Sequence, residues 1–307
     1  MPASRTTIET ASQPECWQRA ADLAPAEAGK LPRDGERVAV IGCGTSWFMA
    51  QSYAALRESG GHGETDAFAA SEFPFGRAYD RVLAITRSGT TTEVLRASER
   101  LRTAGVPVTA ITADPRTPVM EHADEVVVLD FADEESVVQT RFATTALALL
   151  RAHLGQDLTA AVADTRTALA QELPAEIVGA EQFTFLGTGW TYGLAQEAAL
   201  KMREAAGAWT ESYPAMEYRH GPISITGPGR VTWAFGPLPE GLAADVAGVG
   251  GRLEAGSAAP ADGGTGTAAL DPLADLVRVQ RLAVAIAENK GYDPDRPRNL
   301  TRSVVLS

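Results

Sequence analysis

The stretch VAVIGCGTS occupies residues 38–46, and a similar stretch, FTFLGTGWT, occupies residues 183–191. Each is a short apolar run, typical of a buried strand, that ends in Gly-x-Gly and leads into a helix-like pattern. The two copies begin nearly half of the 307-residue chain apart. Because a repeat at that spacing accounts for the whole length, the sequence predicts two similar α/β halves.

Strands and helices alternate along both halves. In the first half, apolar runs at 82–86, 106–112 and 126–129 follow the opening strand, as expected of parallel strands buried on both faces. This alternation indicates open parallel sheets that bind ligands outside the carboxyl ends of their strands. We expect one domain at 1–155 and another at 156–307. The other expected elements are helices at 46–58, 90–103, 139–154, 190–206 and 272–290, a helical bridge at 155–180, strands at 183–186 and 230–235, and a loop at 238–268, where no period is found.

Composition excludes several classes of function. The chain has 45% hydrophobic residues, enough for a sizeable core, and a formal net charge of -12. A negative field repels phosphate backbones and anionic lipids, so we expect no nucleic-acid or membrane partner. Two cysteines cannot form a disulfide framework, and the four histidines show no metal-ligand spacing, so we expect no metal. No signal sequence and no apolar run near the length of a membrane span is found, and we expect a cytoplasmic protein.

Two turns after strands are rich in glycine and hydroxyl groups, at residues 42–46 and 86–92. A helix N-terminus has about four unpaired backbone N–H groups and a partial positive charge, so such turns suit a phosphate group. The second turn is the stronger signal, and the alternative for it is an ordinary Ser/Thr N-cap. Trp47 stands at the third glycine of a dinucleotide fingerprint, and no P-loop motif occurs, which argues against NAD and ATP. A smaller phosphorylated ligand remains.

Candidate catalytic groups lie in the second half. Glu197, Lys201 and Glu204 fall on one face of the helix expected at 190–206. The alternative is a solvated salt-bridge stripe, but this helix directly follows the second Gly-x-Gly turn, where the repeat predicts the mouth of the second sheet. His220 lies in a segment with neither helical nor strand period. Alone it is typical of a surface group, whereas a histidine and a carboxylate together can do general acid–base work.

At these segments the chain resembles the double sugar isomerase (SIS) domain family, in particular the isomerase half of glutamine:fructose-6-phosphate aminotransferase and its single-chain relatives. Order and spacing agree over nearly the whole chain. The resemblance implies two tandem SIS domains, each a three-layer α/β/α, flavodoxin-like, doubly wound parallel sheet. The matching segments are ETASQP (9–14), IGCGTS (41–46), ASEF (70–73), TRSGTT (86–91), ESVVQTR (135–141), EAALKMRE (197–204), RHGP (219–222) and PRNLTRSV (297–304).

The resemblance also implies roles for matching positions. Glu204 falls on the base that moves a proton between C1 and C2, His220 on the residue that assists ring opening from the neighbouring subunit, and Lys201 on a site lysine. We therefore expect a homodimer with sites at the subunit interface and no cofactor. The residues expected to contact the sugar phosphate are Gly44, Thr45, Ser46, Thr86, Arg87 (a glutamine in the aminotransferase), Ser88, Thr91, Val137, Gln139 and Thr301.

Two departures from the family bear on the mechanism. The aminotransferases have an N-terminal glutaminase domain with a terminal cysteine nucleophile, whereas this chain begins Met1-Pro2 and Cys16 falls in the expected leading helix, so we expect no glutamine-derived nitrogen in cis. Arg302, a further catalytic candidate, stands where the aminotransferase has a lysine that forms an imine with the ketose. A guanidinium is not a nucleophile, so Arg302 can bind substrate hydroxyls or the phosphate but cannot form that imine.

The favoured hypothesis is a SIS-family enzyme that converts a substrate of the glucosamine 6-phosphate type to fructose 6-phosphate, by isomerisation coupled to deamination. A fructosamine-6-phosphate deglycase is a near-equal alternative, and plain aldose–ketose isomerisation comes third. A non-catalytic sugar-phosphate sensor is the remaining hypothesis, although the strand at residue 38 starts too early for the helix-turn-helix of such sensors. The groups that select the substrate are expected near Gln139, Trp190, Trp209 and residues 238–268.

Overall fold

A computed structural model describes residues 3–256 and 269–306. The chain divides into two compact units, each built around one parallel sheet. The first unit contains Glu15–Leu158 and the C-terminal tail from Asn299, and the second unit contains the N-terminal residues up to Pro14 and Thr159–Arg298. The main division falls between Leu158 and Thr159. The N-terminal residues are grouped with the second sheet, and the C-terminal tail is grouped with the first.

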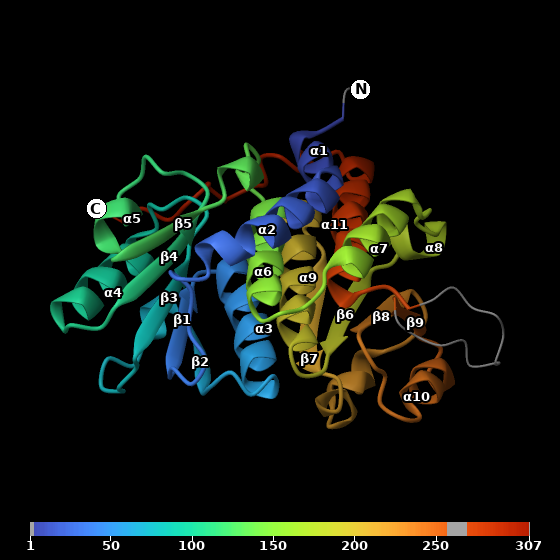
Figure 1. The fold of residues 1–307 in the computed structure, drawn as a ribbon. Helices are drawn as coiled ribbons and strands as arrows, with labels where there is room; N and C mark the ends of the chain where they lie inside the picture. The colour runs from blue at the N-terminus through green and yellow to red at the C-terminus, as the bar shows by residue number, and fades with distance from the viewer. Residues whose placement is uncertain (1–2, 257–268, 307) are drawn as a thin grey trace. The chain divides into compact units, whose positions relative to one another are not determined.

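The first unit has a five-stranded parallel sheet in the order β2-β1-β3-β4-β5. This is the order of flavodoxin-like folds and confirms the doubly wound architecture. Helices cover both faces, with α3 and α6 packed together on one face and α4 and α5 on the other (Figure 1), so β1, β3 and β4 are buried throughout. The elements are β1 (Val38–Gly42), β2 (Thr65–Ala69), β3 (Arg81–Ile85), β4 (Val108–Thr112), β5 (Glu125–Val128), α2 (Gln13–Glu27), α3 (Thr45–Ser59), α4 (Thr92–Thr103), α5 (Val119–His122), α6 (Arg141–His153), η1 (Ala70–Glu72) and η2 (Asp130–Ala132).

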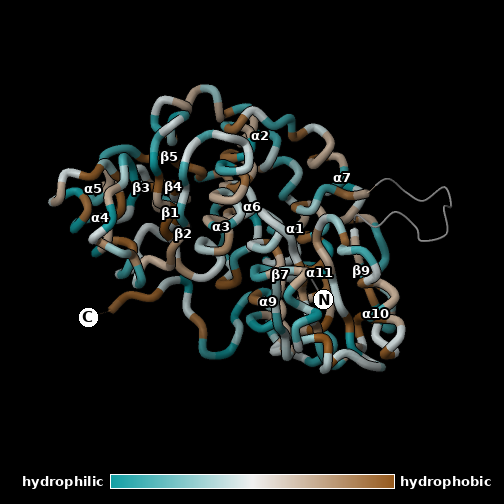
Figure 2. The backbone as a smooth tube through the Cα atoms, turned by 90° about the horizontal axis from the view of Figure 1, so that it is seen from below, coloured by the Kyte–Doolittle hydropathy of each residue, from teal (hydrophilic) through white to brown (hydrophobic). Residues whose placement is uncertain are grey.

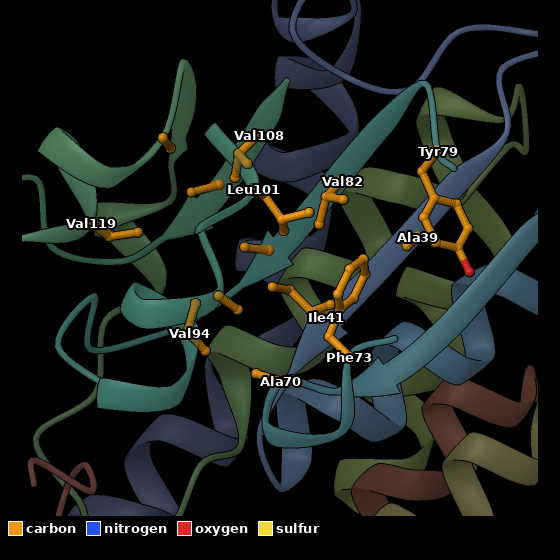
Figure 3. Close-up of a cluster of buried hydrophobic side chains, with 14 residues drawn as sticks. Ala39, Ile41, Ala70, Phe73, Tyr79, Val82, Val94, Leu101, Val108 and Val119 are labelled. Carbon is orange, nitrogen blue, oxygen red and sulfur yellow. The ribbon is translucent and has the colours of Figure 1, made fainter. Parts of the chain in front are cut away.

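A hydrophobic core between the sheet and α4 determines where the loops of the first unit lie. Ile41 of β1 and Val82 of β3 belong to one cluster with Val94 and Leu101 of α4, as Figure 3 shows. The two helical residues are seven positions apart, on one face of the helix. Burial of this face holds the start of α4 against the end of β3, which positions the loop between them.

The second unit has a four-stranded parallel sheet in the order β7-β6-β8-β9. This order repeats that of β2-β1-β3-β4, so the repeat in the sequence is a repeat of the fold. Helices α9 and α11 pack against each other, and α7 and α1 pack on α11. The elements are α1 (Arg5–Ala11), α7 (Thr159–Ala170), α8 (Ala175–Val178), β6 (Gln182–Gly187), α9 (Thr191–Ala206), β7 (Trp209–Pro214), η3 (Glu217–Arg219), η4 (Pro222–Ile225), β8 (Arg230–Phe235), α10 (Leu242–Gly248), β9 (Arg252–Ala255) and α11 (Pro272–Asn289).

The sequence pattern does not identify three strands, one in the first sheet and two in the second. β2, β7 and β9 lie at sheet edges, where most of their positions are only partly buried. They carry polar residues and therefore lack the continuous apolar run of a central parallel strand. The prediction of a loop at 238–268 is wrong in its first part, because α10 and β9 form there. Residues 257–268 lie outside the described residues.

Candidate active site

The two hydroxyl-rich loops lie side by side at the carboxyl edge of the first sheet. The loop of residues 42–46 follows β1 and leads into α3, and the loop of residues 86–92 follows β3 and leads into α4. β1 and β3 are paired and parallel, so both loops leave the sheet at the same edge. In this strand order the chain reverses its winding direction between β1 and β3, which is where doubly wound sheets bind ligands. We call these two loops the cradle.

The cradle has the donors that an anion needs. Ser46, Thr86 and Ser88 are buried, and Ser88 Oγ lies 3.4 Å from Thr91 Oγ1. Neither α3 nor α4 has a side-chain hydrogen bond at its N-cap, which is Gly44 for α3 and Thr91 for α4. Thr91 therefore does not act as an ordinary side-chain cap of α4, and within the loop before α4 Ser88 Oγ accepts a hydrogen bond from the Thr90 amide at 3.3 Å. Both helix N-termini direct their positive ends toward the same edge of the sheet.

Cys43, between Gly42 and Gly44 of the cradle, adds no charge that would repel an anion there. Burial raises the pKa of the Cys43 thiol to about 11, and the negative charge of Glu93 adds to the shift. The thiol is therefore neutral near pH 7 and adds no negative charge to the loop.

Arg87 links the cradle to a third loop, residues 133–140, which leads into α6. The Arg87 side chain is buried; its Nη1 donates to the Ser136 carbonyl at 3.1 Å and its Nη2 to the Val137 carbonyl at 3.2 Å. Nη1 also lies 3.7 Å from Glu134 Oε2, so a buried carboxylate balances the guanidinium charge. Arg87 was expected to donate to a phosphate, and in the structure its terminal nitrogens donate to backbone carbonyls.

Glu134 organises the 133–140 loop and is not among the residues expected from the sequence. Its side chain is fully buried, and its Oε1 accepts hydrogen bonds from the Thr140 and Arg141 backbone amides and the Thr140 hydroxyl. This carboxylate therefore caps the N-terminus of α6 from six residues away. The available signal was an acidic residue shortly before a helix start, but such residues are common and their burial is not visible in the sequence.

The remaining expected contacts of the first unit are close to these loops in the chain or in space. Val137 offers its carbonyl to Arg87. Gln139 is partly buried, and its Oε1 has no hydrogen-bond partner among the described residues. Thr301 lies in the C-terminal tail, where its hydroxyl donates to the Ser303 carbonyl at 2.9 Å.

Lys201 sits between two carboxylates on α9 in the second unit. Its Nζ lies 3.5 Å from Glu197 Oε1 and donates to Glu204 Oε2. The Lys201 and Glu197 side chains are each 1% exposed, and Glu204 is 20% exposed. The alternative of a solvated salt-bridge stripe is therefore wrong, because two of the three groups are out of water. Their charges are paired at short range, as buried charges must be.

The cluster does not lie at the mouth of the second sheet, where the sequence analysis placed it. Lys201 and Glu204 are 10 and 13 residues into α9, or about 15 and 20 Å from its first residue at ~1.5 Å per residue. This end of α9 lies at the start of β7, since Arg203 Nη1 donates to Thr210 Oγ1 at 3.0 Å. His220 is exposed and follows the other end of β7, so within the second unit it is not beside Glu204.

Comparison with known proteins identifies the first unit. The sequence profile of the SIS domain matches residues 33–154, which span all five strands of the first sheet. The chain contains a SIS domain. Its similarity extends over both units to the isomerizing glutamine–fructose-6-phosphate aminotransferase of Sulfurisphaera tokodaii, with 28% identity over 298 residues covering 89% of this chain and 51% of the relative. The SIS-domain protein thus spans about half the length of the curated relatives it matches.

Solved structures show the same fold. The SIS-domain protein is similar to the glucosamine-6-phosphate deaminase of Thermotoga maritima, with a TM-score of 0.76, 22% identity and coverage of 98% of this chain and 100% of the other. It is also similar to the C-terminal domain of the glucosamine-fructose-6-phosphate aminotransferase of Francisella tularensis, with a TM-score of 0.79, 21% identity and coverage of 96% and 98%. Both comparisons confirm an α/β fold with two parallel sheets.

No group of three or more His, Cys, Asp or Glu side chains is arranged to hold a metal ion in the described part of the chain. Across 3–256 and 269–306, no helix has the length and apolarity to cross a membrane.

Proposed function

We propose that the protein binds a sugar 6-phosphate and moves a proton between C1 and C2 of an amino-sugar 6-phosphate, with release of ammonia. One observation carries the proposal: Lys201 holds Glu204 on a buried helix face while leaving that carboxylate 20% exposed. A carboxylate that is fixed by an ammonium group and still reaches solvent has the character of a general base. Glu197, which is almost fully buried, lacks that access.

The comparisons support the substrate class. The curated relatives are isomerizing aminotransferases of fructose 6-phosphate, and one similar structure is a glucosamine-6-phosphate deaminase. The cradle fits the phosphate of such a substrate, since two helix N-termini and several hydroxyl groups meet at one edge of the first sheet. The formal net charge of -12 means that these local donors must hold a dianion against the field of the whole protein.

The chemistry needs no covalent intermediate with the protein. Once the sugar ring is open, the Glu204 carboxylate takes the proton from C2, which gives an enolamine, and returns it to C1. The product is an imine at C2, which water hydrolyses to fructose 6-phosphate and ammonia. No oxidant or amine nucleophile is required, which is consistent with an arginine at position 302.

His220 is proposed to assist ring opening by proton transfer. It follows β7 at the end opposite to Lys201 and Glu204, so its own unit does not bring it to the base. In the family that the chain resembles, a neighbouring subunit supplies the matching histidine. A homodimer is therefore part of the proposal.

The test is an assay of the purified protein with glucosamine 6-phosphate, in which ammonia and fructose 6-phosphate are both measured. Glu204→Gln should lower kcat by at least about 100-fold, since general catalysis contributes roughly 10²–10⁴. Glu288→Gln, at an exposed position of α11, is the matched control and should not change kcat. A Glu204→Gln rate near that of the wild type would remove Glu204 from the mechanism.

Alternative substrates decide among the related reactions. Release of lysine from fructoselysine 6-phosphate, without deamination of glucosamine 6-phosphate, would make the protein a deglycase. Interconversion of fructose 6-phosphate and glucose 6-phosphate without ammonia would make it a plain isomerase. Saturable binding of these sugar phosphates without turnover of any of them would make it a sensor.

A further inference from the structure

The C-terminal tail, residues 299–306, runs along the cradle. The Thr92 amide, at the first residue of α4, donates to the Val304 carbonyl at 3.1 Å, and the Leu306 amide donates to Thr92 Oγ1 at 2.8 Å. Thr90 Oγ1 lies 2.9 Å from Ser303 Oγ. The tail thus follows the edge of the loop that carries Ser88 and Thr91, and Figure 1 shows it in red on the first unit.

Hydrophobic burial does not account for this position. The last apolar residues of the tail, Val304, Val305 and Leu306, are 52%, 67% and 51% exposed, and Figure 2 shows the C-terminal end as a hydrophobic segment. Side chains that remain half in water contribute little apolar burial. Polar contacts must therefore hold the tail.

Arg302 makes those contacts through both its backbone and its side chain. Its carbonyl accepts a hydrogen bond from Arg87 Nη2 at 3.0 Å. Its guanidinium donates through Nη2 to Asp133 Oδ1 at 2.5 Å and through Nη1 to the Glu134 carbonyl. Arg87 and Arg302 therefore tie together the cradle, the 133–140 loop and the tail, and each arginine faces one carboxylate, Glu134 for Arg87 and Asp133 for Arg302.

We propose that Arg87 and Arg302 form a latch that fastens the C-terminal tail to the cradle, and that Arg302 is a positioning residue and not a group that reacts with the sugar. This rests on the proposed function, since what the latch positions is the sugar-phosphate site. The latch aligns three segments that carry expected substrate contacts, represented by Ser88, Val137 and Thr301. Opening the latch should therefore weaken substrate binding more than it slows the chemistry, for which Glu204 is proposed.

Hydrogen exchange tests the latch without reference to activity. In the wild-type protein without ligand, peptides covering residues 86–95 and 299–306 should be protected from exchange, because the Thr92 amide donates to the Val304 carbonyl and the Leu306 amide donates to Thr92 Oγ1. Arg302→Ala should increase exchange of both peptides by about tenfold, the effect of losing a charge-assisted hydrogen bond. Arg302→Lys should recover part of the protection, because an ammonium can keep the contact with Asp133.

Arg102→Ala is the matched control. Arg102 lies in the same unit and makes the same kinds of contact, with Asp124 Oδ1 at 2.9 Å and with the Glu121 carbonyl, at a similar side-chain exposure. It lies away from the tail at the C-terminal end of α4, so Arg102→Ala should leave the exchange of both peptides unchanged.

Kinetics and chemical trapping test the positioning role. Arg302→Ala should raise the KM for the sugar phosphate about tenfold while kcat falls less, and Arg302→Lys should restore part of the affinity. A lysine at position 302 should give no adduct when Arg302→Lys is treated with fructose 6-phosphate and borohydride, because the side chain is directed toward Asp133.

Three results would overturn the proposal. They are exchange of the wild-type tail at the rate of an unstructured peptide, a borohydride-trapped adduct at position 302, and a lower kcat for Arg302→Ala with KM and exchange unchanged. If the wild-type protein converts none of the sugar phosphates, the proposed function fails, and the exchange measurements still decide whether the latch exists.

Discussion

Replacing Lys201 by methionine measures whether the cluster on α9 is a desolvated site or a surface stripe. Methionine has a similar length without the charge, so Lys201→Met leaves the Glu197 and Glu204 carboxylates without their shared cation. Lys201 and Glu197 are each 1% exposed, and neither group can recover the lost interaction from water.

The structure predicts a large loss of stability. Removing one partner of a buried ion pair costs about 3–5 kcal/mol, whereas an exposed pair is worth about 0–1 kcal/mol. With a urea dependence of about 3 kcal/mol per M, the midpoint of unfolding should fall by about 1 M or more. The double variant Glu197→Gln/Lys201→Met should recover part of this loss, because the fully buried carboxylate is then removed as well.

The assay is urea unfolding followed by circular dichroism at pH 7. Lys290→Met is the matched control: Lys290 is exposed at the end of α11, where its Nζ donates to the Ala206 carbonyl at 3.0 Å, and its loss should cost less than about 1 kcal/mol. If Lys201→Met is no more destabilising than Lys290→Met, the cluster is solvated, and the structural argument for Glu204 as the base is refuted.

Three further predictions concern the N-terminus, the cradle and the charge. Burial raises the pKa of Asp295, but hydrogen bonds from the Thr6 and Arg5 amides outweigh this effect, so the pKa lies below its usual value. Asp295 therefore stabilises the fold above about pH 4 and loses this contribution as the pH falls through its folded pKa. Asp295→Asn should therefore cost about 1 kcal/mol in urea unfolding at pH 7, and a cost that does not shrink as the pH falls through the folded pKa of Asp295 would contradict the linkage. Gly89→Ala should raise the KM and destabilise the protein by roughly 1–3 kcal/mol, because Gly89 has φ +60 and a Cβ there would lie 2.0 Å from Thr117 Oγ1. Gly76→Ala is the control and should be close to neutral, because a Cβ at Gly76 would have nothing within 4 Å. Equal effects of the two substitutions would count against the strained loop. Calorimetric affinity for a sugar phosphate should stay flat or improve as salt approaches physiological strength, because screening weakens the repulsion from a net charge of -12; a steep loss would show long-range attraction that this site does not have.

Much of the architecture follows from local pattern. The apolar runs that begin at residues 38 and 183 are β1 and β6, and the Gly-x-Gly after each leads into α3 and α9. Central parallel strands are apolar on both faces, so they are visible in the sequence. β2, β7 and β9 are not, because an edge strand with half-buried polar residues has the composition of a loop.

The candidate site shows the same contrast. The sequence by itself determined which loops are rich in hydroxyls and that Glu197, Lys201 and Glu204 share a helix face, since spacing alone sets that geometry. Only the tertiary structure decided that the face is buried, because burial depends on what packs against the helix. It also decided that Arg87 holds the carbonyl of Arg302, 215 residues away, and that Arg302 faces Asp133. Contacts across such separations are set by the path of the whole chain, and no local pattern of residues encodes them.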